Sequence, residues 1–468
     1  MVAGTSSWAG KSVLATALCA ALARRGLKVQ PFKAQNMSNN ARVVEGGEIG
    51  AAQWFQALAA GVAPCVEQNP VLLKPETQTR SQVIVLGQVD RYLTAMPWRE
   101  RAPHLWNVIR DAYDTLAADC DVVLIEGAGS PAEINLADVD LANLGIGRHA
   151  RAPMLLVCDI DRGGAFAHLF GTWGLLADVD RARVGGFVLN RFRGDASLLH
   201  PGPDMLESRT GVRTLGVVPM VDHGLPDEDG AADITPSATG RKVRIVRGPA
   251  ASNLDEWWQL RDLCDLRWAV APGHLLDADL VILPGSKIAA VDLAWLRRTE
   301  MDAALREAHR QGVAILGVCG GTQILGRAIA DPHGVEHGHT VAGLGLLSTS
   351  TVLKPNKSVQ RSSLTFRDDL GPPWTKLAGL SVEGYEIHFG ETIFSGPARS
   401  ASTDDTAIVD GNVLGVSLHG LCESPVVLEA LVGAPPRRTL DDVLQGLAEL
   451  AERYLDMDAV LRLANCEI

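Results

Sequence analysis

The stretch Gly4-Thr-Ser-Ser-Trp-Ala-Gly-Lys-Ser12 decides the fold of the first half of this chain. A glycine-bounded loop that ends in Lys-Ser and leads into an apolar helix is suited to a phosphate chain, because backbone N–H groups and the helix N-terminus point at the anion. Leucines follow the loop at helical spacing, at positions 14, 18 and 22. We therefore predict a strand–loop–helix nucleotide site in which Lys11 reaches the terminal phosphates and Ser12 binds Mg²⁺.

The spacing of this loop differs from the standard phosphate-binding motif. Thr5 stands where that motif has its first glycine, and Gly4 lies one residue earlier. This longer form resembles the loop of the dethiobiotin synthetases. The residues predicted to bind ATP here are Thr5, Gly10, Lys11 and Ser12.

Length and composition predict a globular protein of more than one domain. With 468 residues the chain is too long for one ordinary core. No apolar run approaches the length of a membrane span, so we expect a cytoplasmic protein. The formal charge of −12 argues against a nucleic-acid partner, which would require a basic face. The eight cysteines form no C-x-x-C pair, which argues against a disulfide framework or a zinc ribbon.

Short apolar runs alternate with helical stretches through the first half, as a parallel α/β sheet requires. The predicted strands are Val29–Phe32, Val122–Ile125, Met154–Cys158, Phe187–Asn190 and Leu215–Val218. Polar or glycine residues follow most of these strands. Because ligands of parallel sheets bind at the carboxyl ends of the strands, we expect these ends to converge around the phosphate loop.

A change of composition divides the chain. Residues 225–241 are rich in Pro, Asp, Gly and Thr, and we interpret them as a linker. We predict a first domain at 1–224, a second α/β domain at 242–436, and amphipathic helices at 437–468 that pack on the second domain. The second domain is predicted to have strands at Val243–Val246, Leu280–Leu283 and Val313–Val318, and helices at Leu293–Ala308 and Gln323–Ala330.

A second candidate site lies at Gly317-Val-Cys-Gly-Gly321, between a predicted strand and a helix. Small residues on both sides of a cysteine at such a turn are typical of a nucleophile elbow, in which the helix N-terminus lowers the pKa of the thiol. The backbone N–H groups of Gly320 and Gly285 are candidates for an oxyanion hole. We predict His419 as the catalytic base of Cys319, with His388 as the alternative.

Several motifs occur together and in order along the chain. They are the phosphate loop, Pro31-Phe-Lys-Ala-Gln-Asn-Met37, Asn69-Pro-Val-Leu-Leu-Lys-Pro75, Glu126-Gly-Ala-Gly-Ser-Pro-Ala-Glu-Ile-Asn-Leu136, Asp159-Ile-Asp-Arg-Gly-Gly164, Pro284-Gly-Ser-Lys287, the Cys319 elbow and Gly384-Tyr-Glu-Ile-His388. This set resembles the cobyric acid synthase family, over essentially the whole chain. The resemblance implies a P-loop, dethiobiotin-synthetase-like parallel-sheet domain followed by a class I glutamine amidotransferase-like α/β domain.

The resemblance also implies an activity. Members use ATP and Mg²⁺ to activate four side-chain carboxylates of the corrinoid adenosylcobyrinic acid a,c-diamide, and replace each with an amide from glutamine. Ammonia released at Cys319 would pass to the ATP site. By the same resemblance Glu126 joins Ser12 on the metal, although it could merely cap its loop. Asn190 resembles an adenine-reading position, although a turn-forming Asn is nearly as plausible.

Some polar residues are candidates to bind the polyanionic corrinoid, and each could instead be a solvated surface group. They are Lys33, Asn36, Asn39, Lys74, Asp161, Arg162 and Arg193. The pattern also departs from triad amidotransferases, which carry His-x-Glu, because Leu421 stands two residues after His419. The alternative functions are an a,c-diamide synthase of the same pathway, a partition-type ATPase switch and a non-catalytic corrinoid carrier. Nothing in the sequence indicates an oligomeric state.

Overall fold

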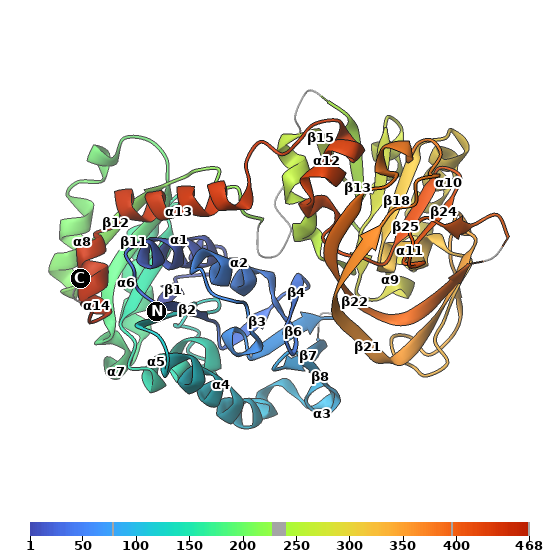
Figure 1. The fold of residues 1–468 in the computed structure, drawn as a ribbon. Helices are drawn as coiled ribbons and strands as arrows, with labels where there is room; N and C mark the ends of the chain where they lie inside the picture. Colours follow the sequence, from blue (N-terminus) through green and yellow to red (C-terminus); the bar gives the residue numbers. More distant parts are fainter. Residues whose placement is uncertain (77–78, 227–239, 395, 467–468) are drawn as a thin grey trace.

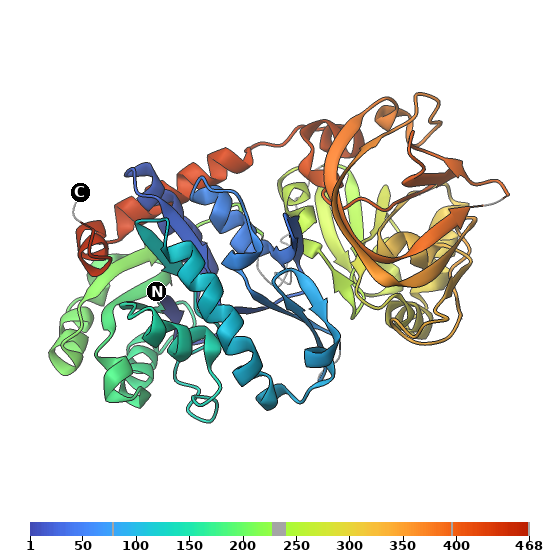
Figure 2. The same ribbon diagram turned by 60° about the horizontal axis from the view of Figure 1, so that its bottom comes forward.

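The structure, a computed structural model, describes residues 1–76, 79–226, 240–394 and 396–466. Two α/β lobes lie side by side, the first built from the N-terminal half of the chain and the second from residues after 240 (Figure 1). The last helices return to the first lobe, as Figures 1 and 2 both show. Each lobe buries its own apolar clusters, as a chain of this length requires.

A parallel sheet forms the centre of the first lobe. Its strand order is β2–β9–β1–β10–β11–β12, in which a bridge between Val2 and Glu126 joins the β2–β9 pair to β1. The strands are β1 (Val2–Gly4), β2 (Val29–Phe32), β9 (Val122–Ile125), β10 (Met154–Asp159), β11 (Val184–Phe192) and β12 (Thr214–Pro219). Every strand predicted in this half is present. Helix α1 (Lys11–Arg24) follows β1, which confirms the predicted strand–loop–helix unit.

Further helices of the first lobe surround this sheet or extend from it (Figure 1). They are α2 (Ala51–Ala59), α3 (Arg91–Ala95), α4 (Ala102–Ala117), α5 (Ile146–His149), α6 (Ala165–Leu175), α7 (Asp178–Arg181) and α8 (Gly202–Thr210).

The side of the first lobe that faces the second lobe is built from short strands (Figure 1). A small sheet has the order β3–β6–β7–β8, and a hairpin β4–β5 runs directly into α2. These strands are β3 (Gln35–Met37), β4 (Ala41–Val44), β5 (Gly47–Gly50), β6 (Val71–Pro75), β7 (Ser81–Val85) and β8 (Gln88–Asp90).

The second lobe is organised around a seven-stranded sheet of order β15–β13–β16–β18–β25–β24–β23. The strands are β13 (Lys242–Val246), β15 (Asp265–Ala269), β16 (Leu280–Leu283), β18 (Ala314–Val318), β23 (Arg399–Ser400), β24 (Ala407–Asp410) and β25 (Val413–Val416). The strands predicted here are confirmed, with ends that shift by at most one residue. The parallel core of this sheet places the end of β18 between β16 and β25.

The helices of the second lobe differ in part from the prediction. They are α9 (Ala289–Arg298), α10 (Met301–Arg310), α11 (Gly320–Leu325) and α12 (Pro425–Val432). The helix predicted over Leu293–Ala308 is wrong, because Glu300 adopts a left-handed φ of 61° that separates α9 from α10. The helix predicted over Gln323–Ala330 ends at Leu325, since Gly326 is extended and a strand follows.

A long antiparallel hairpin covers one side of the second lobe (Figure 1). It pairs β21 (Thr349–Thr365) with β22 (Ser381–Phe394), and β19 (Ala328–Ala330) and β20 (Val341–Ala342) extend its sheet. Two-residue strands β14 (Ala251–Ser252) and β17 (Gly285–Ser286) pair beside the end of β16.

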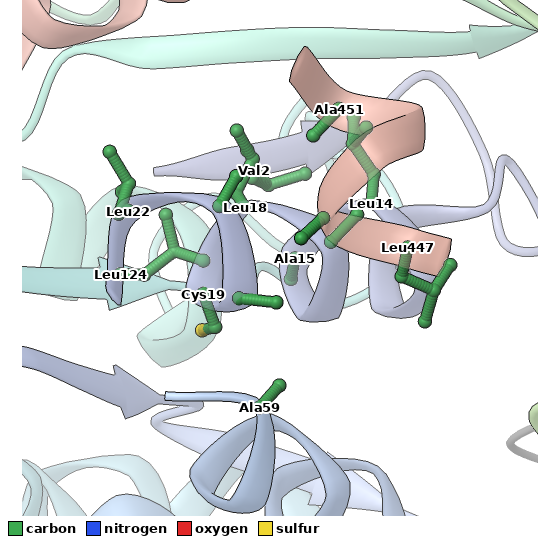
Figure 3. Packing of buried hydrophobic residues seen from close by; sticks show 14 of the residues in the cluster. Val2, Leu14, Ala15, Leu18, Cys19, Leu22, Ala59, Leu124, Leu447 and Ala451 are labelled. Atoms are coloured by element: carbon green, nitrogen blue, oxygen red, sulfur yellow. The ribbon is translucent and has the colours of Figure 1, made fainter. Parts of the chain in front are cut away.

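The C-terminal helices pack on the first lobe, which corrects the prediction that they pack on the second. Helix α13 (Leu440–Tyr454) lies along α1, and Figure 3 shows Leu447 and Ala451 beside Leu14. Helix α14 (Met457–Leu463) joins the same apolar cluster. The amphipathic pattern identified the apolar face of α13 correctly. It carried no information about the partner, which is the outer apolar face of α1.

Most of the predicted linker lies outside the described residues, at positions 227–239. Its first residues, Leu225 and Pro226, line a cavity that the nucleotide loop also lines. Among the helices that the structure describes, none has the length and apolar character needed to cross a bilayer.

Candidate active sites

The phosphate loop is held in place by the end of β11. Gly10 has a left-handed φ of 87°, and a Cβ atom there would lie 2.1 Å from the Asn190 side-chain nitrogen, so only glycine fits. Asn190 is buried, and its amide donates a hydrogen bond to the Ala9 carbonyl at 2.9 Å. The backbone N–H of Thr5 donates to Val157 in β10 at 2.9 Å. Asn190 therefore supports the loop in this structure, and its adenine-reading role stays a prediction.

The Glu126 carboxylate is the centre of a hydrogen-bond network beside the phosphate loop. It is fully buried and accepts hydrogen bonds from the Ser12 hydroxyl at 2.8 Å and from Lys33 at 2.9 Å. Amides of Gln53 and Gln56 in α2 bond its other oxygen at 3.4 and 2.5 Å. A carboxylate and a hydroxyl are oxygen donors that suit Mg²⁺, so this pair fits the metal that the resemblance implies.

The ends of the parallel strands converge around the loop, as predicted. The Lys11 ammonium donates to the carbonyl of Gly129, beyond β9, at 3.2 Å, and to that of Ser6 at 3.1 Å. The Ile160 N–H donates to the Asn190 carbonyl at 3.0 Å. A cavity opens beside this loop, and its lining includes Trp8, Lys11, Ser12, Phe55, Arg191 and Asp255. Asp255 belongs to the second lobe, so this cavity lies at the contact between the lobes.

The residues predicted to bind the corrinoid divide between three places. Lys33 and Asn36 are buried around Glu126, where Asn36 donates to Gln53 at 2.9 Å. Asn39 and Lys74 line a cavity at Cys319. The remaining members lie elsewhere: Arg193 and Asp161 form an ion pair at 2.6 Å, and the exposed Arg162 lies 3.3 Å from the buried Asp159. A shared role in binding the corrinoid stays a prediction.

Cys319 sits on a sharp turn between β18 and α11. Its φ of 50° and ψ of −110° lie outside the ordinary regions for a residue with a side chain, which is typical of a nucleophile elbow. The glycine two residues later is required by space, because a Cβ atom at Gly321 would lie 2.0 Å from the Leu283 carbonyl oxygen. The sequence-predicted elbow is therefore present in the structure.

His419 stands beside the thiol and is held by a carboxylate from elsewhere in the chain. Its Nδ1 lies 3.0 Å from Glu256 Oε1, and the other Glu256 oxygen accepts the Gly420 N–H at 2.8 Å. Glu256 is fully buried. Burial opposes the charge on His419, but Glu256 and Cys319 outweigh it and raise the His419 pKa to about 10.

The same arrangement favours the thiolate form of Cys319. Burial alone would raise the Cys319 pKa, but the His419 charge, its hydrogen bond and the charge of His388 hold that pKa below its usual value. A thiolate paired with an imidazolium is the reactive form of a catalytic cysteine. His388 is committed to a different acid, since its Nε2 lies 3.0 Å from Glu386 Oε2. The geometry supports His419 as the base.

The predicted oxyanion-hole turns meet beside the thiol. A Cβ atom at Gly320 would lie 2.6 Å from the Ser286 nitrogen, and one at Gly285 would lie 2.9 Å from His419 Cε1. These close approaches explain why both positions are glycine. They place two backbone turns at the elbow, which is the setting that an oxyanion hole needs.

The cavity at Cys319 is polar and includes side chains from both lobes. Its lining includes Asn39, Lys74, Lys287, Glu336, Lys357 and His388. Burial raises the Glu336 pKa to about 7 against the nearby Lys287 charge, and burial lowers the Lys287 pKa to about 8. Such a pocket offers both signs of charge to a zwitterionic ligand.

Sequence reasoning missed Glu256. It lies 163 residues before His419 in η5 (Leu254–Asp262), a 3-10 helix. The signal in the sequence was the acidic pair Asp255-Glu256. The structure shows that both of these side chains are buried. A pair separated by that much sequence has no fixed spacing to search for.

Comparison with known proteins agrees with this division into two sites. The CobQ/CobB/MinD/ParA nucleotide binding domain matches residues 1–225, and the CobB/CobQ-like glutamine amidotransferase domain matches residues 242–427. Among solved structures, a crystal structure of a glutamine amidotransferase with 17% identity covers 45% of this chain and 98% of its own, with a TM-score of 0.30.

Relatives named cobyric acid synthase match along almost the whole chain. One from Polaromonas sp. (strain JS666 / ATCC BAA-500) is 50% identical over 97% of this chain and 96% of its own. One from Leptothrix cholodnii is 52% identical over 99% of this chain and 96% of its own. The chain therefore belongs to the cobyric acid synthase family, enzymes that join a nucleotide-binding domain to a glutamine amidotransferase domain.

Proposed function

We propose that this chain converts adenosylcobyrinic acid a,c-diamide into adenosylcobyric acid in the cytoplasm, by amidating the b, d, e and g carboxylates with ATP and glutamine. Membership of the family supports this substrate. One observation carries the proposal: a single chain holds a Ser12–Glu126 nucleotide centre and a thiol backed by His419 and Glu256.

Glutamine is hydrolysed in the second lobe. The Cys319 thiolate attacks the side-chain amide carbon, and backbone N–H groups at Gly320 and Gly285 stabilise the developing oxyanion. His419 gives its proton to the departing nitrogen, so ammonia leaves and a thioester remains. A water molecule, deprotonated by His419, then hydrolyses the thioester to glutamate and restores the thiolate. We assign Glu336 to the α-ammonium group of glutamine, because it is an acidic group in the cavity of the nucleophile.

The acceptor carboxylate is activated in the first lobe. The carboxylate oxygen attacks the terminal phosphorus of ATP, ADP leaves, and the acyl phosphate that forms has an electrophilic carboxyl carbon. Lys11 would bind the phosphates, and Ser12 and Glu126 would hold a Mg²⁺ ion, which when bound would neutralise phosphate charge. Ammonia attacks the activated carbon, an amide forms and phosphate leaves. We also assign Lys33 to neutralising charge on the phosphate, because its ammonium group bonds Glu126 at the predicted metal site.

Mass spectrometry of the a,c-diamide incubated with enzyme, ATP, Mg²⁺ and glutamine tests the proposal. We expect stepwise replacement of acid by amide. Amidation of cobyrinic acid at the a and c positions instead would favour an a,c-diamide synthase. Cys319→Ala should abolish the glutamine-dependent reaction while high ammonium still supports it. Parallel loss of both reactions in this variant would argue against two separable sites.

A further inference from the structure

One arginine of the first lobe is buried among acidic and aromatic groups of the second. Arg42, in β4, is 1% exposed. Its guanidinium donates to the Tyr385 hydroxyl at 2.6 Å and to Glu423 at 2.6 Å, and it lies 2.5 Å from Asp255. It also lies over the Tyr385 ring, 5.2 Å from the centroid. All three partners belong to the second lobe.

Each partner of Arg42 adjoins the base of the glutaminase site. The Tyr385 ring stacks on the His419 ring with centroids 5.4 Å apart and planes 16° apart. The backbone N–H of His419 also donates to the backbone carbonyl of Tyr385 at 2.8 Å. Asp255 immediately precedes Glu256, which binds His419. Glu423 belongs to η8 (Leu421–Glu423), the turn that follows Gly420. Arg42 therefore contacts Tyr385, which stacks on the His419 imidazole, and Asp255, which belongs to the turn that carries Glu256.

Neighbouring residues of the first lobe hold the same turn. The Asn40 side-chain oxygen accepts the Leu254 N–H at 3.0 Å, at the start of η5. The Asn253 amide donates to the Tyr385 hydroxyl at 3.2 Å and to the Ala41 carbonyl at 3.5 Å. The segment that presents Glu256 is thus fastened from the other lobe.

The contact also reaches the nucleotide site. The β4–β5 hairpin that carries Arg42 continues into α2, whose Gln53 and Gln56 amides bind Glu126. Asp255 itself lines the cavity beside Lys11 and Ser12. Arg42 lies between the two sites, on a chain of direct contacts.

Charge explains why this arrangement depends on Arg42. Burial raises the pKa of Asp255 and of Glu423, and the Arg42 charge opposes that shift in both. Without the guanidinium, the buried Asp255 and the partly exposed Glu423 would lose their cation, and the Tyr385 hydroxyl would lose a donor. A turn with an uncompensated buried acid at Asp255 is expected to rearrange, and Glu256 would move with it.

We propose that Arg42 is a positioning residue for the glutaminase site, supplied by the nucleotide-binding lobe, which fixes the His419–Glu256 pair through Tyr385 and Asp255. The glutaminase site is complete only when the first lobe is docked. The inference rests on the proposed function, because it concerns the glutamine hydrolysis assigned to Cys319.

Arg42→Met in the full chain tests this, with Arg244→Met as the matched control. Arg244 is equally buried and bonds two acids, Asp265 at 3.0 Å and Asp277 at 3.1 Å, but none of these groups lines the cavity at Cys319. We expect Arg42→Met to lower kcat for glutamine hydrolysis by about 10- to 100-fold with little change in KM, below the full contribution of a general base. Ammonium-dependent amidation should persist in both variants.

Two readouts separate positioning from loss of folding. The rate of Cys319 alkylation by iodoacetamide should rise with pH about a higher midpoint in Arg42→Met than in the unsubstituted enzyme, because a displaced imidazolium no longer lowers the pKa of the thiol. Arg42→Lys should restore part of kcat. If Arg42→Met is poorly folded, Tyr385→Phe removes only the hydroxyl partner and should give a smaller decrease of the same kind.

Glutamine hydrolysis by Arg42→Met at the rate of Arg244→Met, with an unchanged alkylation profile, would overturn the proposal. So would equal loss of glutamine- and ammonium-dependent activity in a folded Arg42→Met protein. Absence of glutamine hydrolysis in the unsubstituted enzyme would overturn the proposed function itself, and the Arg42 role with it.

Discussion

The two active sites of this chain are each built around a buried glutamate, but they are assembled differently. Glu126 takes its side-chain partners Ser12, Lys33, Gln53 and Gln56 from the first lobe alone. Glu256 binds a histidine 163 residues away, and the turn around it is fastened by Arg42 of the other lobe. The Glu126 centre is thus built within one lobe, although Asp255 of the second lobe lines the cavity beside it, whereas the Glu256 centre is itself fastened by the other lobe.

The largest expected effect comes from the Glu126 centre, whose side-chain partners all belong to one lobe. Glu126→Gln removes the charge that Ser12 and Lys33 share, so metal and phosphate binding should fail. We expect glutamine- and ammonium-dependent amidation to fall together by about a thousandfold, equivalent to roughly 4 kcal/mol in the barrier. Glutamine hydrolysis alone, measured as glutamate release, should fall far less. A Glu126→Gln enzyme that still amidates with ammonium would show that this carboxylate does not serve the synthetase reaction.

Glu256→Gln should affect only the other site. The substitution keeps the shape but removes the charge that raises the His419 pKa to about 10. With a lower His419 pKa, the imidazolium loses its proton at a lower pH than in the unsubstituted enzyme. The Cys319–His419 ion pair is then lost above that pH. We expect glutamine hydrolysis near pH 7 to fall by about a hundredfold, with ammonium-dependent amidation unchanged.

Glu386→Gln is the matched control for that experiment, because it makes the same change beside His388. It should lower glutamine hydrolysis by no more than about threefold, equivalent to roughly 0.7 kcal/mol. If the two variants exchanged these effects, His388 would be the base instead of His419.

The same contrast explains what the sequence could predict. The elbow at Cys319 and the loop through Lys11 are contiguous, and glycines at Gly10 and Gly321 are demanded by local space. The positions of the parallel strands in the first lobe followed from apolar runs that alternate with helical stretches. Glu256 and Arg42 could not be found this way, because their partners are fixed by the docking of distant segments. The helix α13 was misplaced for that reason too, since its apolar face matches any complementary surface.

A smaller effect is expected at the glutamine end of the cavity. Burial raises the Glu336 pKa to about 7, so the carboxyl group is charged above that pH and neutral below it. If it binds the α-ammonium group, KM for glutamine should rise as pH falls from 8 to 6. Glu336→Gln should raise KM at pH 8 by about tenfold, equivalent to 1.4 kcal/mol, and abolish this pH dependence.

The substrate analogue glutaramate, which lacks the α-amino group, sharpens that test. The unsubstituted enzyme should prefer glutamine to glutaramate, whereas Glu336→Gln should hydrolyse both with similar kcat/KM. An unchanged preference for glutamine in the variant would show that another group recognises the ammonium. Ammonium-dependent amidation serves as the control, because it needs no glutamine.

The smallest effect on activity should come from substitutions in the C-terminal helices, because these helices contribute to the stability of the first lobe. Leu447, 2% exposed, packs from α13 in the apolar cluster that contains α1. Leu447→Ala should lower the free energy of unfolding of the first lobe by about 3 kcal/mol, because it leaves a cavity between α13 and α1.

Leu431, 3% exposed, is the matched control in the core of the second lobe. ATP should raise the Tm of the first lobe and so identify its unfolding transition in calorimetry. Leu447→Ala should lower the Tm of that transition, and Leu431→Ala should lower the Tm of the transition of the second lobe. If Leu447→Ala moved only the transition that ATP leaves unchanged, α13 would belong to the second lobe, and the assignment of this helix to the nucleotide-binding lobe would be wrong.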